Sequence, residues 1–229
     1  MPGDTATAPV ELILVRHGET DWNRELRFQG HIDVPLNDMG HEQARRIGLR
    51  VSREAVDHVI SSDLLRAQQT AAPAASLLSL PVATTVALRE QAFGIVDGMR
   101  SEDIQREHPL AWEEWLLFRE DHGLPGGESP RQFHDRIAGA LQAIAHEHAG
   151  RTVLVVTHGG VLDMVWRIAH GLSLSGPRRS IIPNAAFNRV RVASVEASLR
   201  VDVEVWAEVD HLDALPPQPV YDQQRHLKG

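Results

Sequence analysis

The chain has 229 residues, of which 42% are hydrophobic, and its 23 basic and 31 acidic residues give a net charge of −8. This acidic balance argues against nucleic acid as a partner, because binding to a phosphate backbone relies on a basic surface. Without cysteine the chain has no disulfide, no thiolate nucleophile and no cysteine-based zinc site. No signal peptide or membrane-spanning segment is recognisable. We therefore expect a soluble, cytoplasmic protein that has no membrane partner.

The N-terminal part predicts alternating strands and helices after a loose leader of nine residues. The aliphatic run at 12–15 is typical of a strand that is buried on both faces of a parallel sheet. A helix is expected from 36 to about 53, with Asn37 or Asp38 as its cap. The pattern then predicts a strand at 57–61, a helix capped by Ser62 or Asp63 that kinks or breaks at Pro73, and a strand at 81–86.

Residues 87–129 interrupt this alternation. Two short helices are expected, one capped by Ser101 and one carrying Trp112, Trp115 and Phe118, before a turn-rich stretch that ends at Ser129. We interpret 91–129 as a helical cap over the ligand-binding end of the sheet. The aromatic residues are expected to pack the cap onto the core, with the alternative that one of them lies at the edge of the substrate pocket. Glu128 is expected at the entrance of the site.

The C-terminal part predicts a helix at 130–148, a second buried strand at 153–156, a helix ending near 171, an antiparallel edge hairpin at 187–209 and an appended tail at 210–229. One domain over 1–229 accounts for all these elements. Its expected fold is a three-layer α/β sandwich with a mostly parallel central sheet, helices on both faces, the edge hairpin and the small helical cap. The hairpin offers a surface for a homodimer.

Both buried strands end in a His-Gly pair. Arg16-His17-Gly18 follows the first strand, and Thr157-His158-Gly159 follows the second. In open α/β sheets, ligands bind beyond the carboxyl ends of the strands. The two imidazoles are therefore predicted to meet over one crevice, an arrangement that favours a reaction site over a core position.

The stretch from Arg16 to Thr20, followed by Trp22-Asn23, resembles the signature of the histidine phosphatase superfamily, which includes the cofactor-dependent phosphoglycerate mutases. Further blocks resemble that family in its own order and extend the resemblance over residues 11–195. These blocks are Gln29-Gly30, residues 33–44, residues 61–70, Leu88-Arg89-Glu90, Gly127-Glu128-Ser129 with Phe133 and Arg136, and residues 157–160.

The resemblance implies phosphoryl transfer with His17 as nucleophile and Glu90 as the group that protonates the leaving oxygen and later takes a proton from water. A nucleophilic histidine must be neutral, and the charges of Arg16 and Arg66 favour the neutral imidazole. These guanidiniums also match phosphate oxygens, to which His158 can donate. These five residues are the catalytic candidates, and all except His17 are also expected to bind substrate. Further expected substrate-binding residues are Gly18, Thr20, Asn23, Gln29, Gly30 and Gly159.

Taken alone, two of these residues have simpler interpretations, because Arg66 can be a cation on a helix surface and Glu90 an ion-pair partner. We expect no cofactor and no metal, because no convincing ligand cluster is present in the sequence. The substrate partner is expected to be a small phosphorylated metabolite, cleaved as a phosphomonoester. Phosphoglycerate-like acids, sugar phosphates, nucleotides and a cobalamin-pathway phosphate all remain open.

Two other functions stay as alternatives, a cofactor-dependent phosphoglycerate mutase and a non-catalytic module that binds a phosphate ligand. The family's mutases use a lysine in a longer insert after the acid residue, whereas the only lysine here is Lys228. Glu90 and His158 are 68 positions apart, a spacing that resembles the compact phosphatase branch. A binding module would be expected to have lost part of the catalytic set, and none of it is lost.

Overall fold

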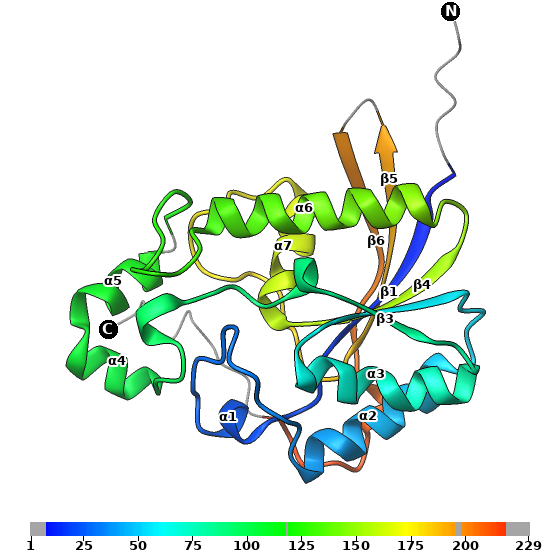
Figure 1. Cartoon of the computed structure of the whole chain (residues 1–229), viewed down its shortest axis with the longest axis horizontal. Coiled ribbons are helices and arrows are strands. Elements are labelled where there is room, and N and C mark those ends of the chain that lie inside the picture. Colours follow the sequence, from blue (N-terminus) through cyan, green and yellow to red (C-terminus); the bar gives the residue numbers. More distant parts are fainter. Residues whose placement is uncertain (1–7, 118, 196–197, 219–229) are drawn as a thin grey trace, which may run out of the picture.

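A six-stranded sheet with the strand order β3-β2-β4-β1-β5-β6 forms the centre of the protein (Figure 1). The computed structural model describes residues 8–117, 119–195 and 198–218. Four strands are parallel: β1 (Val10–Arg16), β2 (His58–Ser62), β3 (Val82–Thr85) and β4 (Thr152–Thr157). The antiparallel edge hairpin consists of β5 (Phe187–Val195) and β6 (Ser198–Glu208). The predicted fold class is confirmed.

Helices cover both faces of the sheet, so β1 is buried on two sides. Successive side chains of a strand point to opposite faces. Leu12 and Leu14 accordingly belong to the core formed with α6 (Pro130–Glu147) and α7 (Gly159–His170). The core on the other face takes Ile13 and Val15 together with side chains of α2 (Asp38–Val51) and α3 (Leu65–Leu78).

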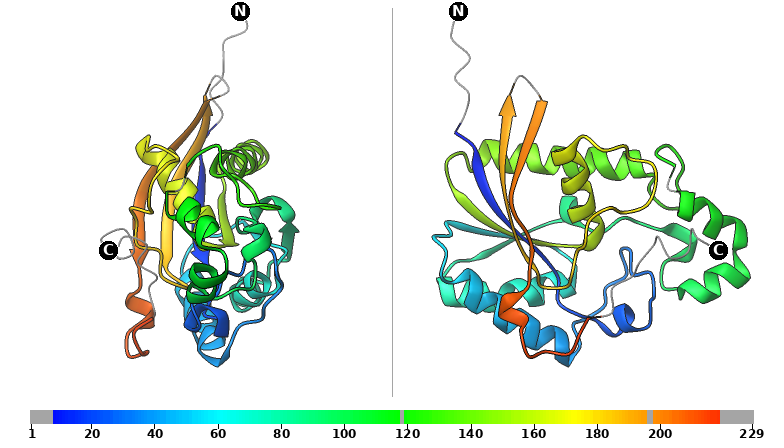
Figure 2. Two further views of the ribbon diagram at one scale, coloured as in Figure 1. Left: turned by 90° about the vertical axis from the view of Figure 1, so that its left-hand side faces the viewer. Right: turned by 180° about the vertical axis from the view of Figure 1, so that it is seen from behind.

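Between β3 and α6 the chain leaves the sheet and forms the cap. In Figures 1 and 2 the cap helices lie beside α1. A small core of Val96, Ile104 and Trp112 holds them together. The short elements of the chain are α1 (Asp21–Arg24), η1 (Val86–Leu88), η2 (Gly94–Val96), α4 (Ser101–Glu107), α5 (Pro109–Leu117) and η3 (Asp210–Leu212).

The predicted N-cap residue is correct for α2 and wrong for α3 and α4. The Asn37 side chain accepts a hydrogen bond from Gly40 N at 2.9 Å, which confirms it as the cap of α2. The caps predicted at Ser62 or Asp63 and at Ser101 are wrong. Leu64 precedes α3 without a side-chain cap, and Ser101 is the first residue of α4. There, the isolated bridge between Arg27 and Arg100 keeps Arg100 extended, so the helix starts after it.

The expected break at Pro73 is also wrong, because α3 is one helix from Leu65 to Leu78, whereas the alternative of a kink stays a prediction. The ring of Pro73 faces Gly48 of α2, where an added Cβ would lie 3.1 Å from Pro73 Cβ. Ala67, Ala71 and the alanines after Pro73 are buried in the same interface. Close packing against α2 therefore holds the helix continuous despite the proline.

The tail is not simply appended to the domain. After η3 the chain returns to Gln218, whose amide forms two hydrogen bonds with the backbone of Asn184, of 2.7 and 3.0 Å. Phe118, most of the expected leader (1–7), residues 196–197 of the hairpin turn and tail residues 219–229 lie outside the described residues. Among the helices that the structure describes, none is long and apolar enough to cross a membrane.

Candidate active site

Two histidines meet at the carboxyl end of the sheet because β1 and β4 are adjacent and parallel. Arg16 is in register with Thr157, and His17 N donates to Thr157 O at 2.9 Å. The next residue on each strand is therefore a histidine at the same edge, and the ring centroids of His17 and His158 are 5.3 Å apart. This geometry confirms the predicted convergence of the imidazoles.

The buried ring of His17 is held in one tautomer. Its Nδ1 lies 2.7 Å from the carbonyl oxygen of Gly18, and because a carbonyl can only accept, Nδ1 carries the hydrogen. Nε2 of the neutral ring then carries the lone pair. Burial, followed by the charges of Arg66 and Arg16, lowers the pKa of His17 well below 6.5. Asn184 Nδ2 donates to the His17 carbonyl at 2.8 Å and fixes the backbone.

His158 is completely buried beside His17. Its Nε2 lies 2.8 Å from the hydroxyl of Ser62, the last residue of β2. Nδ1 is buried and has no hydrogen-bond partner among the described residues. Burial, and then the charge of Arg66, lowers the pKa of His158 well below 6.5. In the tautomer in which the Ser62 hydroxyl donates to Nε2, Nδ1 carries the hydrogen and can donate it to an anion.

Two arginines bring positive charge to the histidines. Arg66 is fully buried, so the interpretation as a surface cation is wrong, and it donates to Ile32 O at 2.8 Å and to Gly30 O at 2.9 Å. Arg16 Nη1 donates to Ile182 O at 2.7 Å. Burial lowers the pKa of each arginine to about 10, so both remain charged at neutral pH. Both Nε atoms are buried without a hydrogen-bond partner in the described part of the chain.

The Glu90 carboxylate lies at the N-terminus of α7. Gly160 N donates to its two oxygens at 3.1 and 3.0 Å, and Gln91 N donates to Oε1 at 2.9 Å. Its negative charge raises the pKa values of both Arg16 and Arg66 and thereby offsets part of the lowering that burial causes. Glu90 therefore faces the same group of residues as the histidines.

A cavity of about 160 Å³ lies beside this group of residues. The predicted site residues that line it are Arg16, His17, Asn23, Gln29, Arg66, Glu90 and Gly159. His158, Gly18, Thr20 and Gly30 are not in its lining. Gly18 N donates to Thr70 Oγ1 at 2.9 Å, Thr20 caps α1, and Gly30 binds Arg66 through its carbonyl. The contacts of these three residues position other groups of the site.

Sequence reasoning missed much of the cavity wall. The loop between α7 and β5 contributes Arg178, Ser180 and Ile182, and the remaining unpredicted lining residues are Trp22, Leu26, Arg27, Phe28 and Phe93. The Ser180 hydroxyl and Gln29 Oε1 are buried without a hydrogen-bond partner among the described residues. Arg178 lies 3.8 Å from the carboxylate of Asp163. The only sequence signal for this loop was its pair of adjacent arginines.

The cap contributes to the cavity through Phe93 and Trp115, whereas Trp112 packs into the small core of the cap. The placement of Glu128 at the entrance is wrong. Its carboxylate is bound to Arg136 and to the backbone of Ala92 instead, and it is not in the lining of the cavity.

A larger cavity of about 510 Å³ lies between the β2–β3 edge and α6, away from the paired histidines. None of its lining residues is arginine or lysine, so it has no strong cation for a phosphate. Within the described part of the chain, no group of three or more histidine, aspartate or glutamate residues is placed to hold a metal ion. The expectation of metal-independent chemistry remains a prediction.

The family follows from a comparison with family models. Residues 12–202 match the model of the histidine phosphatase superfamily, branch 1. The chain belongs to this superfamily. The match spans both His-Gly pairs, Arg66 and Glu90.

Three known proteins are similar to most of the chain. The Arabidopsis thaliana phosphoglycerate mutase-like protein 4 is 39% identical over 206 residues, which cover 89% of this chain and 87% of that protein. Bacillus stearothermophilus YhfR has 28% identity and a TM-score of 0.80, with 89% and 100% of the two chains covered. A mycobacterial glucosyl-3-phosphoglycerate phosphatase complexed with VO3 has 25% identity and a TM-score of 0.76, with 87% and 99% covered.

Proposed function

We propose that this histidine phosphatase superfamily member hydrolyses a small phosphomonoester through a phosphohistidine intermediate. The observation that carries the proposal is one cavity in which the neutral ring of His17, the guanidiniums of Arg16 and Arg66 and the carboxylate of Glu90 come together. Phosphoryl transfer requires a nucleophile, cations for the phosphate oxygens and a proton donor, and these four side chains supply all of them.

In the first step, His17 Nε2 attacks phosphorus and the bond from phosphorus to the ester oxygen breaks. The leaving oxygen takes a proton from Glu90, whose carboxylate binds this proton when the dianionic phosphate enters the cavity. Arg16 and Arg66 bind the nonbridging oxygens through their unpartnered Nε groups, and His158 donates from Nδ1. Positive charge develops on the His17 ring, where the Nδ1 hydrogen bond to Gly18 O stabilises it.

In the second step, water attacks the phosphohistidine. The Glu90 carboxylate takes a proton from this water, the bond from phosphorus to Nε2 breaks, and the electron pair returns to the ring. Inorganic phosphate leaves, and both neutral His17 and protonated Glu90 are restored. The same carboxyl group thus acts as acid and then as base.

Phosphoglycerate mutase is the second candidate, and the printed name of the Arabidopsis relative favours it. The named phosphatase among the structural neighbours and the absence of a core lysine favour hydrolysis. Arg178 weakens the lysine argument, because it brings a further guanidinium to the cavity. The two functions are separated by incubating the protein with 3-phosphoglycerate and the bisphosphorylated cofactor of the mutase reaction. A hydrolase releases phosphate, whereas a mutase forms the 2-phospho isomer.

Rapid quenching with a ³²P-labelled aryl phosphate tests the mechanism. We expect acid-labile label on the wild-type protein and none on His17→Ala. Glu90→Gln should keep the first step, because an aryl leaving group needs no proton, and accumulate label while turnover falls about 10²–10⁴-fold. The exposed His41 provides the control, and His41→Ala should behave as wild type. Normal labelling of His17→Ala would overturn the assignment of the nucleophile.

A further inference from the structure

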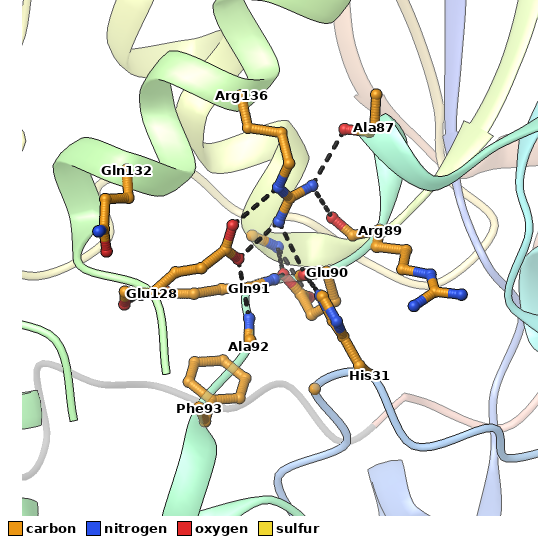
Figure 3. Close-up of polar contacts among 12 residues, drawn as sticks. His31, Ala87, Arg89, Glu90, Gln91, Ala92, Phe93, Glu128, Gln132 and Arg136 are labelled. Atoms are coloured by element: carbon orange, nitrogen blue, oxygen red, sulfur yellow. Dashed lines mark hydrogen bonds and ion pairs between the residues drawn. The ribbon is translucent and has the colours of Figure 1, made fainter. Parts of the chain in front are cut away.

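The backbone that leads to Glu90 is bound by side chains at four successive carbonyl groups. The carbonyls of Ala87, Arg89 and Glu90 accept hydrogen bonds from Arg136, at 3.0, 2.9 and 3.1 Å (Figure 3). The carbonyl between them, that of Leu88, accepts from Thr157 Oγ1 at 2.8 Å. The segment forms no strand here, so side chains replace the backbone partners that a sheet would provide.

Arg136 also binds a carboxylate. Its Nε and Nη2 donate to the two oxygens of Glu128 at 2.8 and 2.6 Å, in the bidentate geometry of the strongest ion pairs. One guanidinium thus contacts three carbonyls and a carboxylate. An ammonium group has three hydrogens on one atom and cannot span these positions.

Glu128 holds the backbone on the other side of Glu90. Its Oε2 accepts from Ala92 N at 3.0 Å, and its own backbone N donates to Ala92 O at 2.9 Å. Its carbonyl accepts from the side chain of Gln91 at 2.9 Å. Burial acts to raise the pKa of Glu128, but the hydrogen bonds from Arg136 and Ala92 outweigh it and keep the carboxylate ionised.

We propose that the Arg136–Glu128 pair positions the Glu90 carboxylate for proton transfer, without itself touching the substrate. The proposal rests on the proposed function. Arg136 fixes the backbone up to the Glu90 carbonyl, and Glu128 fixes it from Ala92 onward. The backbone is thus fixed before and after Glu90, and the Glu90 carboxylate accepts hydrogen bonds from Gly160 N. Arg136 and Glu128 are positioning residues, and neither lines the catalytic cavity.

The leaving group of the substrate provides the test. Arg136→Met should lower kcat/KM about 10²-fold for an alkyl phosphate, whose leaving oxygen needs a proton, and no more than about threefold for a dinitrophenyl phosphate, which needs none. Arg136→Lys should not restore the alkyl activity. The milder variant Glu128→Gln should show the same selective loss if Arg136→Met does not fold.

Arg131 provides a matched control on the same helix, because its ion pairs with Glu120 and Asp121 lie on the surface. Arg131→Met should change neither activity more than twofold. A double variant gives a second test. In Glu90→Gln the acid is already absent, so adding Arg136→Met should cause no further loss with the alkyl phosphate.

An equal loss for the two phosphates would show that the pair has only a structural role and would overturn the proposal. So would an additive loss in the double variant, or unchanged alkyl activity in Arg136→Met. Failure of the proposed function would look different, because the wild-type protein would then release phosphate from neither ester.

Discussion

At the scale of single residues, the site leaves little room around the carboxylate of Glu90, the proposed proton donor. A Cβ added to Gly160 would lie 2.1 Å from Glu90 Oε1 and 3.0 Å from Phe133 Cε1. The carboxylate is the end of a flexible side chain and can move, whereas the buried Phe133 cannot easily do so. Gly160 therefore defines where the Glu90 carboxylate can lie.

Gly160→Ala should displace the Glu90 carboxylate and leave the fold intact. We expect kcat for an alkyl phosphate to fall at least about tenfold, and at most by the 10²–10⁴-fold that complete loss of an acid–base group costs. Gly139, in α6, is the control, because an added Cβ there meets nothing within 4 Å. Gly139→Ala should keep full activity and gain about 0.5–1 kcal/mol of stability in urea unfolding. Unchanged kcat in Gly160→Ala would contradict this role.

The sequence was informative about residues that follow the ends of strands. His17 and His158 could be predicted to meet, because parallel strands end at one edge and each run carried the same pair of residues. Arg178 and Ser180 could not, since their loop is placed by contacts with distant residues. The role of Glu128 was missed for the same reason, because its partners Ala92 and Arg136 become neighbours only after folding.

At the scale of elements, α7 orders the loop that completes the cavity. Asp163 and Arg167, one turn apart, are both buried and form an ion pair with a distance of 2.8 Å. Arg167 also donates to the carbonyls of Gly176 and Pro177, at 2.8 and 3.1 Å. Arg178 follows directly. The buried pair thus connects a helix of the sandwich to the wall of the cavity.

Arg167→Met should leave the Asp163 carboxylate buried without its main partner. We expect the free energy of unfolding to fall by about 3–5 kcal/mol, the usual cost of breaking a buried ion pair. Arg45, exposed on α2 and paired with Glu42, provides the comparison. Arg45→Met should cost no more than about 1 kcal/mol. Similar losses in the two variants, measured by urea unfolding, would contradict the role given to the buried pair.

Most elements could be predicted because their signals are local. The buried aliphatic runs gave β1 and β4, and Asn37 gave the start of α2. The errors at Pro73 and Ser101 came from contacts between elements: Gly48 accommodates the proline ring, and the bridge to Arg27 shifts the start of α4. Local propensity cannot report such contacts, which decide the outcome where they are strong.

At the scale of the whole molecule, the buried histidines couple stability to pH. The folded-state pKa values of His17 and His158 lie well below 6.5, so both rings are neutral in the folded protein when they would be charged in the unfolded chain. Below about pH 6.5 the unfolded chain binds more protons. The stability associated with the neutral rings is therefore complete above this pH and is lost as pH falls.

Between pH 7.5 and 5.5, each of these histidines should reduce the free energy of unfolding by about 1.4 kcal/mol. Urea unfolding at the two pH values measures the loss. In His17→Asn the difference between the two pH values should shrink by the contribution of one histidine. An unchanged difference in this variant would show that His17 does not carry the effect.

A second expectation for the whole molecule is that catalysis needs no metal ion. In the proposed mechanism the charges of Arg16 and Arg66 balance the phosphate dianion and the neutral His158 donates a hydrogen bond, so no divalent cation is needed to neutralise the phosphate. Dialysis against a chelator should leave the release of phosphate unchanged within about twofold. Loss of activity that returns on addition of a divalent cation would contradict the proposed mechanism.

The two ends of the cap meet beside Glu90, and this has a consequence for substrate range. Ala92 N donates to the Glu128 side chain and Ala92 O accepts from Glu128 N. Further along, Ile95 N donates to Pro125 O at 3.0 Å. The chain between Ile95 and Pro125 is thus a loop whose two ends are joined by hydrogen bonds. Doubling the length of a flexible loop costs only about 0.6 kcal/mol. Under the proposed function, replacing the loop should change the alcohol that is recognised while Glu90, the proposed proton donor, keeps its place.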